Sequence, residues 1–96
     1  MYTVQVASYL NPVTALAHKA RLERAGIPAW TVTATVGGQE FTRVRIGAAT
    51  SAADARAVAD KIRATLHYPV WITTVGDRTV LPGDALTVTR AYAAGS

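Results

Sequence analysis

The chain contains the same arrangement of strand, helix and strand twice between residues 2 and 75. In the first copy Val4-Gln5-Val6 leads through a helical stretch to Pro28-Ala29-Trp30-Thr31, and in the second Val44-Arg45-Ile46 leads through another to Pro69-Val70-Trp71-Ile72. Two such units in tandem are typical of a split βαβ domain, in which a four-stranded antiparallel sheet carries both helices on one face. We therefore expect an α+β fold whose second sheet face is open and available for binding.

Composition is that of an ordinary folded domain. The 96 residues are enough for one hydrophobic core, and 50% hydrophobic against 17% charged residues exclude the composition of a disordered chain. No apolar run approaches the roughly 18 residues of a membrane span, and no signal-peptide pattern is present. We expect no membrane contact by this segment. Since Met1 directly precedes a strand, we expect the chain to be a module of a larger protein that carries the targeting segment.

The charge balance is modestly basic. A net charge of +4 arises from 10 Lys and Arg against 6 Asp and Glu, and a field of this sign favours polyanions such as nucleic acid or anionic wall polymers. The charges form no basic run, so a soluble, arginine-rich surface explains them equally well. Cys is absent, which excludes disulfides, thiolate metal sites and thiol catalysis.

Hydrophobic periodicity and cap signals predict the element boundaries. Asn11-Pro12 has the pattern of an N-cap followed by the first helical residue, and Ser51 with Asp54 resembles a capping box. We expect strands near residues 2–8, 29–36, 40–47 and 70–75 and helices near residues 12–25 and 51–66.

Residues 77–96 are expected to be an extension of a domain that spans residues 1–76. The pattern weakens from Asp77 onwards, although residues 86–89 alternate between apolar side chains and threonine, as in a short extra strand at a sheet edge. We expect residues 93–96 to be disordered.

The sequence lacks a catalytic or metal-binding pattern. The acids fall on predicted helix surfaces, in turns or in the tail, so no two of them converge on a pocket, and no serine lies in a nucleophile elbow. Gly37-Gly38 lacks the spacing of a phosphate loop. His18 lies on the apolar stripe of the first helix without metal-ligating partners, so we interpret it as a packing residue. The sequence predicts a binding module that is not an enzyme and uses no cofactor or metal.

Polar side chains gather on the sheet face opposite the core. Alternation places Gln5 on this face, and it places Arg43 and Arg45 there if Val44 and Ile46 point to the core. The first and third strands are neighbours in the split βαβ order, so these three polar side chains are expected to lie together.

The two tryptophans give conflicting signals. Pseudo-symmetry places Trp30 and Trp71 on the same face, yet alternation puts Trp71 on the open face and assigns Trp30 to the apolar half of its strand. A β-bulge is one way to reconcile the two patterns. We expect Trp71 to be exposed and Trp30 to be mainly a packing residue.

Several short motifs together resemble the SPOR (sporulation-related repeat) domain over about residues 2–75. They are Tyr2-Thr3-Val4-Gln5-Val6-Ala7-Ser8-Tyr9, then Ala15, Leu22 and Gly26 with Ala29, and finally Arg43-Val44-Arg45-Ile46-Gly47 before the second helix. The resemblance implies a ferredoxin-like βαββαβ fold that binds bacterial peptidoglycan, with a preference for glycan strands without stem peptides, as found at division septa. The chain departs from the family pattern at Ala7-Ser8-Tyr9 (usually Gly-Ser-Phe), at Gly47-Ala48 (usually Gly-Pro) and at His18 (usually apolar).

The resemblance and the surface chemistry together suggest a glycan site. A sugar polymer presents hydroxyl groups, acetamido groups and apolar ring faces, so its receptor needs amides, guanidinium donors and an aromatic platform. Gln5 and Arg43 match family positions associated with glycan binding. We expect the glycan-binding residues to be Gln5, Ser8, Tyr9, Arg43, Arg45 and Trp71. The implied protein is a monomeric module in the periplasm or cell envelope that directs a parent envelope or division protein to the septum.

Two other functions use the same topology. The RNA-recognition motif stacks bases on closely spaced aromatics of its third strand, but here only Phe41 occurs there, so we expect no nucleic-acid partner. In a protein-interaction module the open face or an edge strand would dock a partner.

Overall fold

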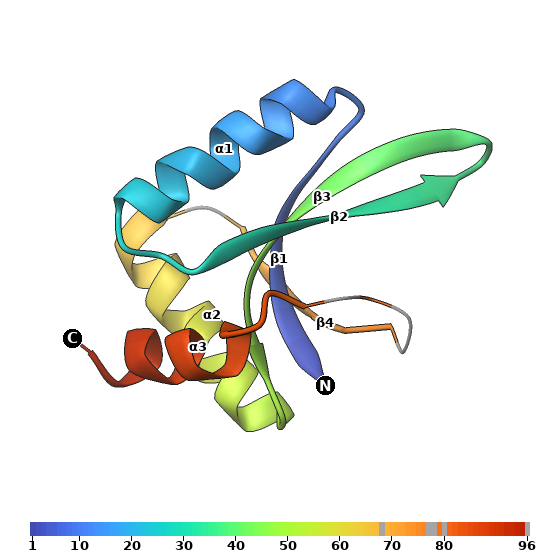
Figure 1. Cartoon of the computed structure of the whole chain (residues 1–96). Coiled ribbons are helices and arrows are strands. Elements are labelled where there is room, and N and C mark those ends of the chain that lie inside the picture. The colour runs from blue at the N-terminus through green and yellow to red at the C-terminus, as the bar shows by residue number, and fades with distance from the viewer. Residues whose placement is uncertain (68, 77–78, 80, 96) are drawn as a thin grey trace.

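The chain folds into one antiparallel sheet of four strands with three helices, as Figure 1 shows for the computed structural model, which describes residues 1–67, 69–76, 79 and 81–95. The elements in chain order are β1 (Tyr2–Tyr9), α1 (Pro12–Arg24), β2 (Ala29–Val36), β3 (Gln39–Ala49), α2 (Ala52–Leu66), β4 (Trp71–Thr74) and α3 (Ala85–Ala94). The order across the sheet is β2-β3-β1-β4. The predicted split βαβ fold is confirmed, and the six predicted elements lie within two residues of their expected bounds.

Both predicted N-caps are confirmed. The Oδ1 of Asn11 accepts a hydrogen bond from the Val13 N–H at 2.9 Å, and Pro12 occupies the first turn of α1. The Oγ of Ser51 accepts from the Asp54 N–H at 3.2 Å at the start of α2. These side chains satisfy backbone donors that a helix cannot pair internally.

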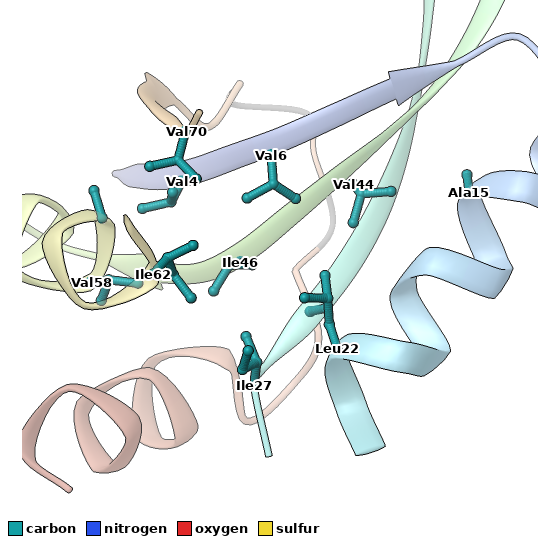
Figure 2. Packing of buried hydrophobic residues seen from close by; sticks show 12 residues of the cluster. Val4, Val6, Ala15, Leu22, Ile27, Val44, Ile46, Val58, Ile62 and Val70 are labelled. Carbon is teal, nitrogen blue, oxygen red and sulfur yellow. The ribbon is translucent and has the colours of Figure 1, made fainter. Parts of the chain in front are cut away.

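The hydrophobic core lies between the sheet and the helices α1 and α2 (Figure 2). Val4, Val44 and Ile46 enter it from the two central strands, where Leu22 of α1 and Ile62 of α2 complete the cluster. Burying a side chain of this size stabilises the fold by about 1.5–3 kcal/mol. The apolar halves of β1 and β3 therefore decide which sheet face α1 and α2 cover.

Residues 86–89, expected as an edge strand, instead belong to the helix α3. Helical spacing brings Ala85 and Thr89 to one side, where both are buried. β2 pairs with β3 only as far as Ala29 opposite Ile46, so β3 extends past the end of β2. Thr89 Oγ1 accepts the Ala48 N–H there at 2.8 Å. A helix therefore covers the sheet edge that an extra strand was expected to pair.

The expected disorder of residues 93–96 is also wrong where the structure describes them. Ala93 and Ala94 form the last turn of α3, while Ser96 lies outside the described residues, as does Asp77, where the extension was expected to begin.

The close approach of α3 requires glycine at position 47. Gly47 has a φ of +64°, and a Cβ at this position would lie 2.7 Å from Thr89 Oγ1. Its N–H also donates to the Pro28 carbonyl at 2.8 Å. Both the left-handed backbone and the space therefore exclude a side chain.

We expect Gly47→Ala to lower the free energy of unfolding by about 2–4 kcal/mol, because left-handed strain and overpacking add. In a Thr89→Ala background the same change should cost only the strain, about 1–2 kcal/mol. Urea denaturation of the four proteins of this double-mutant cycle measures the coupling. Equal costs of Gly47→Ala in both backgrounds would show that α3 does not press on Gly47.

His18 links α1 to the end of β1. Its Nδ1 lies 3.0 Å from the Tyr9 hydroxyl, and the two rings meet edge to face. Burial, together with the nearby Arg21, lowers the pKa of His18 from its ordinary value of 6.5. The fold therefore favours the neutral imidazole, in agreement with the interpretation of His18 as a packing residue.

Because the unfolded chain binds this proton more readily than the fold does, we expect stability to fall as the pH decreases below about 6.5. His18→Leu should reduce the slope of stability against pH between pH 7.5 and about 5.5. Leu16→Ala, at an exposed position of α1 that does not titrate, is the control and should leave the slope unchanged. An unaltered slope in His18→Leu would contradict the assignment.

Candidate functional site

A row of four side chains crosses all four strands on the face turned away from α1 and α2. Trp30 of β2 pairs with Arg45 of β3, Arg45 with Gln5 of β1, and Gln5 with Trp71 of β4. Directly opposed residues in antiparallel strands project to the same face. The neighbouring pair, Val4 and Ile46, points to the core. We call these four residues the cross-sheet row.

Contacts within the cross-sheet row fix its polar groups. The Nε–H of Arg45 donates to Gln5 Oε1 at 3.2 Å, and the Arg45 guanidinium carbon lies 5.7 Å from the centre of the Trp30 ring. The Nε1–H of Trp30 donates to the Gly47 carbonyl at 3.0 Å. The two predicted partners Gln5 and Arg45 thus lie together, held between two tryptophans.

A β-bulge at Val6 changes the pattern along β1. Gln5 pairs with Arg45, but Ala7 pairs with Val44, so Val6 is an extra residue. Beyond the bulge Ser8 lies opposite Arg43 and joins the face of Gln5. The structure therefore brings together the expected Gln5, Ser8, Arg43, Arg45 and Trp71.

Tyr9, expected to line the glycan site, lies on the other side of the sheet. It packs against the core cluster and its hydroxyl contacts His18. Plain alternation from Gln5 would place Tyr9 beside Gln5, but the bulge reverses the alternation. Tyr9 therefore supports α1 and does not belong to the site.

Exposure divides the face into two parts. Gln5 is 7% exposed, Arg45 6% and Trp30 3%, whereas Trp71 is 47% exposed. The predictions of an exposed Trp71 and a packed Trp30 are confirmed. Trp30 nevertheless lies on the same face as Trp71, as pseudo-symmetry indicated, and the bulge invoked to reconcile the two is not needed in β2.

Arg43 brings an uncompensated donor to the face, beside the buried Arg45. Burial, and then the charge of Arg43, lower the pKa of Arg45. The Nε of Arg43 is buried and has no acceptor among the described residues. A buried donor without an acceptor is costly, so this face carries one hydrogen-bonding group whose demand the described residues do not meet.

At the Trp30 end, the cross-sheet row borders a groove between the end of α1 and α3. Trp30 and Gly47 line this groove of about 640 Å³ together with Pro82, Ala85 and Val88. No local sequence signal indicates this contact, because it joins segments far apart in the chain. Phe41 also lies on this face, opposite Ala34. Alternation along β3 indicates the same placement, because Phe41 is two residues from Arg43.

The described residues hold no group of three or more His, Cys, Asp or Glu side chains that could bind a metal ion. Within the same part of the chain, no helix has the length and hydropathy that a bilayer span requires. What the face offers is an amide, guanidinium groups, a hydroxyl and aromatic rings, which are groups that bind polar polymers.

Comparison with known proteins agrees with this geometry. The model of the SPOR domain family matches residues 1–74. The crystal structure of the RlpA SPOR domain from Pseudomonas aeruginosa is similar to 78% of this chain and all of that chain, with a TM-score of 0.62 and 25% identity. No protein with a curated description matches. The chain belongs to the SPOR domain family and is a peptidoglycan-binding module.

Proposed function

We propose that the chain binds peptidoglycan glycan strands that lack stem peptides, through the face that carries the cross-sheet row. The observation that supports this most directly is the grouping of Gln5, Arg45 and Trp71 in one row with Ser8 and Arg43 beside it. The proposed glycan-binding residues are these five.

The chemistry of each side chain suits a sugar polymer. Trp71 is half-exposed and offers a flat ring to the apolar face of a sugar. The guanidinium group of Arg43 lies on a partly exposed side chain, and Ser8 is exposed directly opposite it. These groups can bond acetamido and hydroxyl oxygens. Gln5 and Arg45 extend the same surface beneath them.

SPOR domains occur in proteins of the cell envelope. We propose that this chain acts in the periplasm as a monomeric, non-catalytic module that directs a parent envelope protein to the division septum. A strand stripped of stem peptides exposes its sugar rings along its whole length, so it can lie across a flat sheet without steric hindrance from peptides.

Sedimentation with purified sacculi tests the proposed ligand. Removing the stem peptides with an amidase should increase the fraction of protein that sediments. A gel shift on single-stranded RNA and a partner pull-down serve as parallel assays for the two other functions that the topology allows. Loss of binding after amidase treatment would show that the peptides, rather than the glycan, are recognised.

We expect no soluble muropeptide or glycan fragments when the protein is incubated with sacculi, because none of the five proposed glycan-binding residues carries the carboxylate that glycoside hydrolysis needs. Chromatography of the supernatant measures release, and a muramidase is the positive control. Turnover that persists after repurification would show that the module is an enzyme.

Arg43→Ala should weaken sacculus binding roughly 10- to 150-fold, since a hydrogen bond to a charged group contributes about 1.5–3 kcal/mol. Trp71→Ala should also weaken binding by removing the ring platform. Arg56→Ala, an equal charge change on the exposed side of α2, is the control and should bind as wild type does.

The melting temperature of each variant separates binding from folding. Gln5→Ala separates binding from folding less well. Gln5 is buried and accepts a hydrogen bond from the Arg45 Nε–H, so its removal leaves a buried donor without an acceptor and also lowers stability. Wild-type binding by both Arg43→Ala and Trp71→Ala would exclude this face as the site.

A further inference from the structure

The chain beyond β4 has to cross the sheet to reach α3. β4 is one edge of the sheet, whereas α3 lies against the end of β3 and beside α2, and it lines a groove with Trp30 of β2, at the opposite side. The core fills the face covered by α1 and α2, so the crossing takes place over the other face. Figures 1 and 2 agree, since the stretch that leads into α3 passes β1 and β3 on the side away from the core. We call residues 81–95 the C-terminal cover.

The C-terminal cover is held by specific contacts in the middle and at the end of α3. In the middle, Thr89 Oγ1 accepts the Ala48 N–H at 2.8 Å, and the Thr89 side chain fills the place that a Cβ at position 47 would take. Near its end, Lys61 Nζ donates to the Tyr92 carbonyl at 2.5 Å and to the Gly95 carbonyl, and it lies 3.9 Å from the centre of the Tyr92 ring. These contacts make a defined docked position.

The cover lies over the part of the face where the cross-sheet row is buried. Trp30 lines the groove beside Pro82 and Ala85, and Gln5 and Arg45 are almost inaccessible although both project away from the core. Ser8 and Trp71, farther from α3, remain exposed. A sugar ring cannot reach Gln5 or Arg45 while the cover is docked.

We propose that the C-terminal cover is an intramolecular competitor of the glycan: the residues that lead into α3 cross the β3–β1 part of the binding face, and release of the cover exposes Arg45 and Gln5, together with Trp30, to the glycan strand. This inference rests on the proposed function. If the cover is docked in most molecules, the measured affinity is that of a partly blocked site. When only a fraction f of the molecules can bind, the apparent affinity is reduced by the factor f.

Release of the cover leaves the hydrophobic core in place. The twelve residues of the buried core cluster all belong to residues 4–70, although Tyr92 packs at its rim. The SPOR family match ends at residue 74, before the cover begins. The docked helix is thus an addition to a sheet whose core is formed without it.

Thr89→Asp in the full chain should release the cover, because it places a charge at a buried contact with Gly47 and Ala48. Thr87→Asp, the same change at an exposed position of α3, is the matched control. A red shift of tryptophan emission verifies release, since Trp30 becomes exposed. We expect Thr89→Asp to bind amidase-treated sacculi about tenfold more tightly and Thr87→Asp to bind as wild type. A released cover with unchanged or weaker binding would overturn the proposal.

Hydrogen exchange of the wild-type chain decides the question if Thr89→Asp unfolds or retains the docked helix. Soluble glycan strands, released from sacculi by amidase and sonication, should accelerate exchange of the α3 amides while β1 and β3 become more protected. Unchanged or slower exchange in α3 would mean that the cover stays docked in the complex, and the inference would be wrong. If neither the wild type nor either variant sediments with sacculi, the proposed function itself fails, and the inference falls with it.

Discussion

The bulge at Val6 in the central strand β1 decides which side chains share each face of the sheet. Before it, Val4 faces the core and Gln5 lies beside Arg45; after it, Ala7 faces Val44 and Ser8 lies beside Arg43. Without the extra residue, Ser8 would point into an apolar cluster and Tyr9 would leave His18. One inserted residue in a strand with neighbours on both sides thus assembles the polar face and fastens α1 to β1 at the same time.

A second constraint comes from the unequal lengths of β2 and β3. Because β3 continues past Ala29, its backbone needs another partner, and Thr89 supplies one at Ala48. Gly47 permits the approach because it carries no side chain. The same contacts hold α3 at the end of β3, two residues beyond Arg45. The Arg45 guanidinium is held by its cation–π contact with Trp30 and by its hydrogen bond to Gln5, so its donors keep a fixed orientation.

Most of the fold could be predicted from local patterns. The caps at Asn11 and Ser51 and the apolar halves of β1 and β3 act within a few residues of one another, and the face of Gln5, Arg43 and Arg45 followed from alternation. Tyr9 was expected to line the glycan site but packs against the core, because the bulge that turns it there carries no residue signature. Residues 86–89 were assigned to a strand because a run of four alternating residues fits both periods, and only the contact with Gly47 distinguishes them.

By itself, the sequence determined the βαββαβ order, the membership of the core and the identity of the polar side chains that face away from it, because these depend on periodicity along single elements. The tertiary structure alone decided that Ser8 shares a face with Gln5, that Tyr9 turns to the core, and that Gln5, Trp30 and Arg45 are buried. Those outcomes depend on register between strands and on a helix that docks some forty residues away in the chain. Pairings at such separation are set by the packing of the whole sheet, which no local pattern records.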